Sequence, residues 1–493
     1  MTLELQRFKH TLRSHAEQKA STIALWGDQL KLDYATLYAE VMYRQQRLRD
    51  EQITVIALAL DNGAEFILWD LAALFEGVTC LMLPPFFSPA QRKHCLLQSQ
   101  AQRVIAEPEL EVELQSAGYE RSGVFWSKAF SGASPMHEGT AKLTFTSGTT
   151  GTPKGVCLSA EAILRVVREL DHASKPSDSQ HHLALLPLAI LLENIGCYAA
   201  LYAGATLSLP SQKTLGIQGA SGVDVTRLLG CLARRAPASL ILVPQLLLIL
   251  VSAAEQKMFD PQSLRFVAVG GARVSEALLH RAHREGLPVY EGYGLSECAS
   301  VVCLNRPGSQ RPGSVGRPLA HVDIRLADDG EVLIKGSPLL GYLGDAPHLE
   351  QWWPSGDLGE FDPEGYLYLR GRKKHQFVTS FGRNVNPEWV EAELTQRRHI
   401  AQAFVYGEAM PGNHALLWPH RPDCVDADLA AAVAEANEAL PDYAQVHHWT
   451  RLDQPFTAAN GFLTANGRPR RDAIVEHYQA QLTQSAFSEE SAS

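Results

Sequence analysis

Nine consecutive residues, 147–155, combine the residue types that bind phosphate groups. They include three glycines, four hydroxyl-bearing residues, one proline and one lysine, Lys154. Glycines adopt backbone conformations that other residues disfavour, so the loop can turn successive backbone N–H groups and hydroxyls toward an anion. Lys154 adds a positive charge. We therefore interpret this loop as a polyphosphate-binding loop.

The loop does not fit the Walker A pattern, in which a second glycine stands five residues after the first and precedes a lysine. Pro153 stands five residues after Gly148. A flexible surface loop is the alternative, since Gly, Ser and Thr are common in loops. The preceding residues 143–146 indicate a buried strand, and apolar residues recur at helical spacing from Val156. Strand, loop and helix in succession would place the anion at a helix N-terminus.

Two further strand ends carry candidate ligand-binding residues. A predicted strand at 264–269 ends at residues 270–272, whose small side chains let a flat ligand approach the backbone. A second strand leads to Glu291, which could accept a hydrogen bond from an exocyclic amine, and to Glu297, a candidate metal ligand. For either glutamate, the alternative is a solvated or capping residue.

Asp357 is expected in a turn, where its carboxylate could bind a ribose diol. A turn aspartate that caps its own backbone is the alternative. The apolar run 240–251 is too short to cross a bilayer. We expect it to form a core strand and helix, which could also line a pocket for a hydrophobic substrate.

The length of 493 residues predicts two or more domains. Apolar runs alternate with helical patterns up to about residue 140, which indicates βα units with a parallel sheet. From Ser314, glycine-punctuated short strands predict a small β-rich subdomain. The basic stretch 371–375 is expected to be a strand-free link to an α+β C-terminal domain. The predicted fold class is therefore α/β, with parallel sheets in a large N-terminal domain.

The composition is that of a soluble globular enzyme, with 45% apolar and 20% charged residues. A net charge of −10 argues against general nucleic-acid binding, which favours basic surfaces. The eight cysteines form no CxxC pair, so we expect them to be reduced. The first fifteen residues contain no apolar run typical of a secretory signal, which predicts a cytoplasmic protein.

In order along the chain, these motifs resemble the adenylate-forming superfamily of acyl-CoA synthetases, peptide-synthetase adenylation domains and beetle luciferases. The resemblance covers nearly the whole chain. Within the superfamily it is closest to long-chain fatty acyl-CoA synthetases. Residues 379–391 carry this likeness most clearly, together with Leu186–Leu188 and the pair Glu193 and Asn194.

The resemblance implies ATP, Mg²⁺ and CoA as cofactors, and it assigns roles by motif. Residues expected to hold the phosphates are Thr146, Ser147, Gly148, Thr149, Thr150, Gly151 and Lys154. Residues expected around adenine are Gly270, Gly271, Ala272, Glu291, Gly292, Tyr293 and Gly294. Ser296 would contact the α-phosphate, and Glu297 with Thr149 would hold Mg²⁺. Asp357 and Arg372 would bind ribose. The expected catalytic residues are Lys154, Glu297, Arg468 and Thr149.

The resemblance also implies an N-terminal domain of residues 1–371, a hinge at 372–376 containing Lys374, and a mobile C-terminal domain of residues 377–493. In such enzymes a carboxylate attacks the α-phosphorus of ATP and displaces pyrophosphate. The C-terminal domain then rotates, and a thiol, usually that of CoA, attacks the acyl-adenylate. The expected substrate is a hydrophobic, fatty carboxylic acid.

Three positions depart from the family pattern. Arg468 stands where the family has its adenylation lysine, His375 where an acidic residue often follows the hinge, and Ile190 where a histidine or aromatic residue often gates the acyl pocket. Two other acceptors stay open, a carrier protein acting in trans and an amine. A non-catalytic acyl- or nucleotide-binding protein is the alternative from another class. Peripheral membrane contact during uptake of a lipid substrate also stays open.

Overall fold

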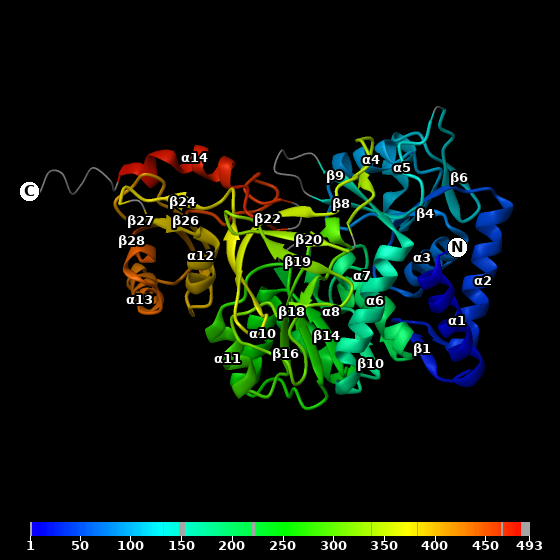
Figure 1. Ribbon diagram of the computed structural model, residues 1–493, viewed down its shortest axis with the longest axis horizontal. Coiled ribbons are helices and arrows are strands. Elements are labelled where there is room, and N and C mark those ends of the chain that lie inside the picture. The colour runs from blue at the N-terminus through cyan, green and yellow to red at the C-terminus, as the bar shows by residue number, and fades with distance from the viewer. Residues whose placement is uncertain are drawn as a thin grey trace, which may run out of the picture.

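The structure is a computed structural model that describes residues 2–131, 133–146, 153–218, 222–336, 338–381, 383–464 and 467–484. Five predicted phosphate-binding residues lie outside these ranges, namely Ser147, Gly148, Thr149, Thr150 and Gly151. Figure 1 shows a large N-terminal domain, coloured blue to yellow, and a small C-terminal domain that ends in red. The predicted α/β fold class, with a large N-terminal and a small C-terminal domain, is confirmed.

One sheet of eight strands carries the segment that leads into the phosphate loop. Its order is β21-β9-β8-β4-β3-β5-β7-β6. The strands are β3 (Val55–Ala59), β4 (Thr79–Met82), β5 (Arg103–Ala106), β6 (Glu120–Ser122), β7 (Phe125–Ser127), β8 (Thr140–Thr146), β9 (Lys154–Ser159) and β21 (Gly341–Tyr342). Strands β8, β4, β3 and β5 pair in parallel, as the predicted βα units require.

The segment after the phosphate loop is a strand, so the prediction that a helix follows the loop directly was wrong. Strand β9 pairs antiparallel with β8, with Lys154 opposite Thr146. Helix α6 (Ala160–Ser174) begins after Ser159, whose side chain caps it. The apolar residues at 156–158 are fully buried in the sheet. A short apolar run of this kind does not distinguish a strand from the first turn of a buried helix.

The second large sheet has nine strands in the order β18-β17-β16-β15-β14-β10-β11-β1-β2. The strands are β1 (Ile23–Trp26), β2 (Lys31–Asp33), β10 (His181–Leu183), β11 (Thr206–Ser208), β14 (Ser239–Leu242), β15 (Phe266–Val269), β16 (Val289–Tyr293), β17 (Cys303–Leu304) and β18 (Arg317–Pro318). Pairing is parallel from β16 through to β1. The carboxyl ends of β15 and β16 therefore lie at the same edge of the sheet.

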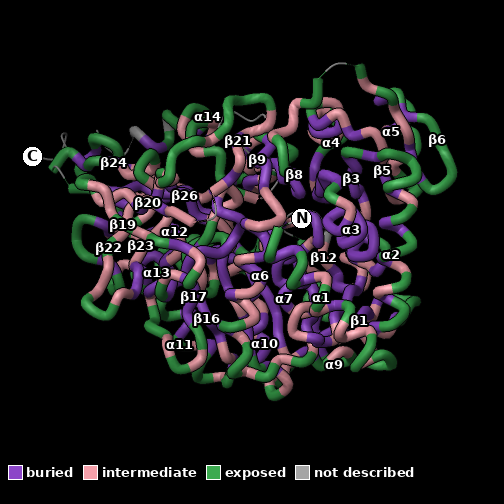
Figure 2. The backbone as a smooth tube through the Cα atoms, turned by 45° about the vertical axis from the view of Figure 1, so that its right-hand side comes forward, coloured by how far each residue is buried: buried purple, intermediate pink, exposed green. Residues whose placement is uncertain are grey.

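Helices cover both faces of the two large sheets. They are α1 (Leu3–Gln18), α2 (Tyr34–Asp50), α3 (Ala64–Glu76), α4 (Pro89–Gln98), α5 (Glu111–Ser116), α6, α7 (Leu191–Ala203), α8 (Gln212–Leu215), α9 (Val225–Arg235), α10 (Pro244–Glu255) and α11 (Glu276–Arg284). Ile56 and Leu58 of β3 face the core that holds α3, α6 and α7, whereas Val55, Ala57 and Ala59 face the core that holds α4. Both faces of this strand are therefore buried, as Figure 2 shows in purple.

The predicted β-rich subdomain is a four-stranded antiparallel sheet of β19 (Asp323–Leu326), β20 (Glu331–Lys335), β22 (Trp353–Phe361) and β23 (Leu367–Arg372). Asp357 lies within β22, so its prediction in a turn was wrong. It pairs across the sheet with Arg372. The turn-like signal came from Gly356, whose φ of 71° gives a local irregularity inside the strand. Because β23 includes Gly371 and Arg372, the strand-free link is shorter than predicted.

The C-terminal domain has its own sheet and its own buried cores. Its elements are β24 (Phe377–Val378), β25 (Asn384–Val385), α12 (Pro387–Thr395), β26 (Ile400–Tyr406), β27 (Asn413–Pro419), α13 (Asp426–Asn437), β28 (Val446–Arg451) and α14 (Arg471–Gln484). Strands β26, β27 and β28 form one sheet. Apolar clusters cover both of its faces. The domain therefore has the α+β composition predicted for it.

One side chain connects the end of β23 with the start of the C-terminal domain. Asn386 caps α12 by accepting a hydrogen bond of 3.2 Å from the backbone N–H of Glu388. The amide nitrogen of Asn386 donates to the carbonyl oxygen of Arg370 at 2.6 Å. The residue thus holds the strand and the helix on either side of the basic link.

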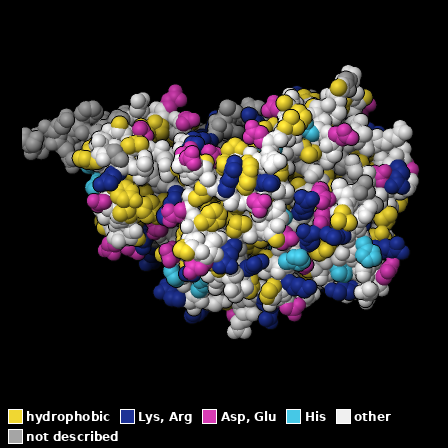
Figure 3. Space-filling view, viewed as in Figure 1, with side chains coloured by type: hydrophobic (Ala, Val, Ile, Leu, Met, Phe, Trp, Pro, Cys, Tyr) yellow, Lys and Arg dark blue, Asp and Glu magenta, His cyan; other side chains and the backbone are white. Residues whose placement is uncertain are grey.

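The surface is mixed in charge. On the face shown in Figure 3, basic and acidic side chains are interspersed over both domains. Among the helices in the described part of the chain, none has the length and apolar character needed to cross a bilayer. All eight cysteines are free and buried.

Candidate active site

The two glycine-containing segments predicted around adenine lie next to each other. Gly270 follows β15, and a Cβ built on it would lie 3.2 Å from the carbonyl oxygen of Gly292 in β16. A Cβ on Gly294 would overlap the carbonyl oxygen of Ser300, so only glycine fits there. Gly271 and Ala272 are exposed beside this contact. These small residues leave a flat surface at the edge of the sheet.

Glu291 is the buried polar group of this surface. It is only 6% exposed. Its Oε1 accepts a hydrogen bond from the backbone N–H of Val274 at 3.4 Å, whereas Oε2 is buried without a hydrogen-bond partner in the described part of the chain. Burial raises the pKa of Glu291 to about 8. At neutral pH the group is therefore a neutral carboxyl that can donate one hydrogen bond and accept another, which fits the donor–acceptor edge of adenine.

Three residues predicted to lie around the nucleoside form one hydrogen-bonded cluster. The hydroxyl of Tyr293 donates to Asp357 Oδ2 at 2.5 Å. Arg372 Nε lies 2.9 Å from Asp357 Oδ1. Burial raises the pKa of Asp357, and the neighbouring Arg372 guanidinium opposes that rise. The cluster joins β16 to the consecutive strands β22 and β23, with Tyr293 and Asp357 64 residues apart in the sequence.

Glu297 and Lys154 lie on either side of a tyrosine that the sequence analysis missed. Glu297 is in a short 3₁₀ turn, η3 (Ser296–Cys298), which begins with half-buried Ser296. The hydroxyl of Tyr342 donates to Glu297 Oε1 at 2.9 Å. Lys154, the first residue of β9, places Nζ 5.4 Å from the centroid of the Tyr342 ring. A carboxylate is the ligand type that Mg²⁺ prefers, so Glu297 fits its predicted role chemically.

Arg468 reaches this region from the C-terminal domain. Its Nη2 donates to the carbonyl oxygen of Gly271 at 3.5 Å. The guanidinium also interacts electrostatically with the carboxylates of Asp357 and Glu297 and with Arg372. Within its own loop, the carbonyl oxygen of Arg468 accepts from the backbone N–H of Thr464 at 2.8 Å. The position predicted for the family lysine therefore faces the predicted nucleotide site.

The basic link between the domains holds two further predicted positions. Lys374 lies in the turn after β23, where desolvation and the positive charges of Arg372 and Arg468 lower the pKa of its ammonium group. His375, which departs from the family pattern, pairs through Nδ1 with Glu388 Oε1 of α12 at 2.7 Å. The sequence analysis assigned no role to Glu388 or Asn386, although both lie in the stretch 379–391 that carries the family likeness.

An apolar junction lies between the two large cores, next to Gly270. Leu192 of α7 and Ala268 of β15 are partly exposed and contact both cores. Ile190, in the position predicted for the gate, precedes α7 and packs against the core around α10. The run 240–251 forms β14 and most of α10, as predicted.

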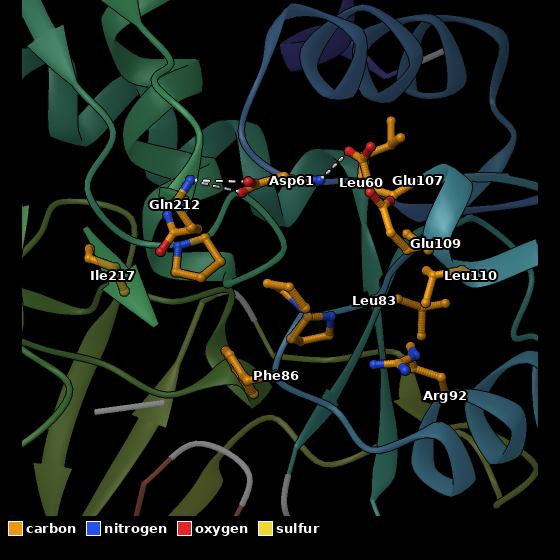
Figure 4. Close-up of a pocket in the computed structure, with 14 residues that line it drawn as sticks. Leu60, Asp61, Leu83, Phe86, Arg92, Glu107, Glu109, Leu110, Gln212 and Ile217 are labelled. Carbon is orange, nitrogen blue, oxygen red and sulfur yellow. Dashed lines mark hydrogen bonds between the residues drawn. The ribbon is translucent and has the colours of Figure 1, made fainter. Parts of the chain in front are cut away.

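A separate cavity of about 290 Å³ opens at the carboxyl ends of β3, β4 and β5. Figure 4 shows Asp61 hydrogen-bonded to the backbone N–H of Gln212, with Phe86 and Arg92 across the cavity. The described residues that line it include none of the predicted site residues. It is therefore distinct from the predicted nucleotide site.

Comparison with known proteins decides the family. Residues 12–343 match the family described as AMP-binding enzyme, and residues 374–490 match the AMP-binding enzyme C-terminal domain. The chain belongs to the AMP-binding enzyme family. The enzyme class predicted from the sequence, AMP-forming, is thereby confirmed.

Curated relatives of this AMP-binding enzyme act on different acids. The long-chain-fatty-acid–CoA ligase FadD15 of Mycobacterium bovis is 27% identical over 423 residues, which cover 69% of this chain and 68% of that ligase. The indoleacetate–CoA ligase of Aromatoleum aromaticum is 30% identical over 286 residues, which cover 54% of each chain. The relatives thus share the CoA-ligase description but not one class of acid.

Solved structures show the same fold. The o-succinylbenzoate CoA synthetase of Bacillus subtilis, in complex with ATP and magnesium ion, aligns with a TM-score of 0.74 at 23% identity and covers 94% of this chain and 98% of that one. The amide bond synthetase McbA of Marinactinospora thermotolerans aligns with a TM-score of 0.76 at 20% identity and covers 96% of this chain and 99% of that one. The predicted cofactors ATP and Mg²⁺ are those bound in that o-succinylbenzoate CoA synthetase structure, and CoA is the acceptor named for the curated ligases.

Proposed function

We propose that this AMP-binding enzyme is an ATP-dependent acid–thiol ligase that activates a hydrophobic carboxylic acid and transfers its acyl group to CoA. The observation that carries the proposal is the approach of Arg468 to Gly271, with the carboxylates of Asp357 and Glu297 nearby. This contact joins the C-terminal domain to the nucleotide surface of the N-terminal domain. A site completed by two domains suits a reaction of two successive steps.

In the proposed first step, a carboxylate oxygen of the acid bonds to the α-phosphorus of ATP, and pyrophosphate leaves. Arg468 and Lys154 stabilise negative charge on the phosphate oxygens, since preorganised cations act where charge develops. Mg²⁺ bound by Glu297 would neutralise phosphate charge. In the second step, the CoA thiolate bonds to the acyl carbon, and AMP leaves.

The remaining predicted contacts are part of the same proposal. The flat edge beside Gly270 and the neutral carboxyl of Glu291 would hold adenine. The pair of Asp357 and Arg372 would hold the ribose diol. Ser296 is proposed to contact the α-phosphate. The phosphate-binding role of residues 147–151 remains a prediction, because they lie outside the described residues.

We also propose that residues 372–376 form the hinge between domains 1–371 and 377–493. The exposed turn with Lys374 directly follows β23, and the next elements belong to the C-terminal domain. After adenylation, rotation at this turn would remove Arg468 from the nucleotide and open a path for the thiol. Eight free cysteines and the use of ATP and CoA support the cytoplasm as the compartment.

The proposed substrate is an acid with an apolar body, either a fatty chain or an aromatic ring. The apolar junction that contains Leu192 and Ala268 would take that body, because Ala268 lies two residues before Gly270 in the chain. Ile190 places an aliphatic side chain at the position where the resemblance implies a histidine or aromatic residue that gates the acyl pocket. The long-chain and indoleacetate ligases among the relatives support both kinds of acid.

Pyrophosphate release from ATP tests the proposal, measured with a panel of fatty, aryl and short acids, without and then with CoA. Release with one acid class that rises to full turnover with CoA, and yields acyl-CoA by mass, would support it. Release that stalls near one turnover, unrelieved by CoA, would indicate a carrier-protein or amine acceptor. Nucleotide binding without release for any acid would refute the ligase function and leave a binding protein.

A further inference from the structure

Tyr342 contacts two predicted site residues through different parts of its side chain. Its hydroxyl donates to Glu297 Oε1 at 2.9 Å. Its ring centroid lies 5.4 Å from Lys154 Nζ, a distance at which a cation is attracted to an aromatic face. The proposed metal ligand and the proposed phosphate-binding lysine therefore share one partner.

Backbone pairing fixes the position of this tyrosine. Strand β21 pairs antiparallel with β9, with Tyr342 opposite Val156. The backbone N–H of Leu343 donates to the carbonyl oxygen of Gly155 at 2.8 Å, and that of Leu339 donates to the carbonyl oxygen of Glu297 at 2.7 Å. The segment is thus bonded both to the strand that carries Lys154 and to the turn that carries Glu297.

Neighbouring rings restrict the tyrosine further. His137 Nε2 lies 2.9 Å from the carbonyl oxygen of Tyr342. A Cβ on Gly341 would overlap the His137 imidazole, so glycine allows this packing. The rings of Tyr342 and Trp353 pack edge-to-face, with a centroid distance of 6.1 Å and an interplanar angle of 65°. A tyrosine whose backbone is held by β9 and His137 and whose ring packs against Trp353 can orient its partners without itself being rearranged.

We propose that Tyr342 is a positioning residue, which orients the Glu297 carboxylate for Mg²⁺ and orients Lys154 for the phosphate groups of ATP. The inference rests on the proposed function, because it takes Glu297 as the metal ligand. A hydrogen bond to one oxygen fixes the plane of a carboxylate. Removing such a partner of a metal ligand typically weakens metal affinity about 10–100-fold. The face of the Tyr342 ring attracts the Lys154 ammonium group, and this contact does not depend on the Tyr342 hydroxyl.

Two substitutions separate these roles. Tyr342→Phe removes the hydroxyl and keeps the ring, whereas Tyr342→Leu removes both. The assay measures binding of a non-hydrolysable ATP analogue to the full chain at a series of Mg²⁺ concentrations. Electron paramagnetic resonance of Mn²⁺, used in place of Mg²⁺, reports bound metal directly. Tyr342→Phe should weaken metal affinity about 10-fold or more and leave metal-free nucleotide affinity unchanged. Tyr342→Leu should also weaken metal-free nucleotide binding roughly two- to fivefold, because the lysine loses its aromatic contact.

Tyr366→Phe is the matched control, since the Tyr366 hydroxyl lies 3.0 Å from Ser309 Oγ and away from both site residues. It should leave metal and nucleotide affinity unchanged. Thermal melting of each variant separates a positioning effect from misfolding. Metal affinity in Tyr342→Phe that equals or exceeds the wild-type value would overturn the inference while the proposed function stands. A wild-type protein that binds no metal–nucleotide complex and releases no pyrophosphate would overturn both.

Discussion

Relative to the wild type, the Glu291→Gln variant should become progressively more stable as the pH rises. Burial raises the pKa of Glu291 from 4.5 to about 8, so the folded state disfavours the ionised carboxylate. The stability associated with the neutral carboxyl is fully present below pH 4.5 and is lost as the pH rises toward 8. Glutamine keeps the size and the hydrogen-bonding edge of the neutral carboxyl and cannot ionise.

The magnitude follows from the two pKa values. A shift from 4.5 to about 8 corresponds to about 5 kcal/mol of lost stability once the group is fully ionised. Between the two values, the difference in stability between Glu291→Gln and wild type should grow by about 1.4 kcal/mol per pH unit. From pH 5.5 to 7.5 the variant should therefore gain about 2.7 kcal/mol relative to wild type.

Urea unfolding of ligand-free protein at several pH values measures this difference. Comparing the variant with wild type at each pH cancels the titration of every other group. Glu350→Gln, at an exposed position, is the control and should show no growing difference. A constant difference between Glu291→Gln and wild type across this range would show that Glu291 is ionised in the folded protein, and would refute its role as a neutral hydrogen-bonding edge for adenine.

Three further substitutions test other parts of the site. Arg468→Ala should slow acid-dependent pyrophosphate release about 10²–10³-fold, whereas Arg470→Ala in the same loop should not; equal rates in both variants would exclude Arg468 from adenylation. Asp357→Asn breaks the ion pair with Arg372 and should weaken ATP binding roughly tenfold by calorimetry, and unchanged affinity would argue against the ribose contact. Gly294→Ala forces a backbone shift and should lower the free energy of unfolding, measured by urea titration, by about 3 kcal/mol. A variant as stable as the wild type would contradict this reasoning.

The sequence was most informative at strand ends. Gly270 directly follows β15, and Glu291 in β16 pairs with Val269, the last residue of β15, so a shared sheet edge brings these positions together. The strand after the phosphate loop could not be predicted, because residues 156–158 form too short a run to reveal its period. Asp357 was placed in a turn on the evidence of one glycine, although pairing with Arg372 keeps it in a strand.

Tyr342 was missed for a different reason. It carries no charge, and the flanking Gly341 and Gly344 were interpreted only as the ends of short strands. Its contacts with Glu297 and Lys154 exist only because β21 pairs with β9, a long-range pairing that local patterns do not encode. The same holds for Asn386, whose partner Arg370 lies in β23, on the other side of the basic link.

The side-chain amide of Asn386 stabilises the observed arrangement of the domains against rotation. It binds Arg370 on one side of the proposed hinge and caps α12 on the other. Any swing about residues 372–376 must break the bond to Arg370, at a cost of about 0.5–1.5 kcal/mol. At equilibrium this alone favours the arrangement with Arg468 at the nucleotide surface by roughly two- to tenfold. The resting enzyme would thus mostly occupy the form that activates the acid, with the rotated form as a minority of about a tenth to a third.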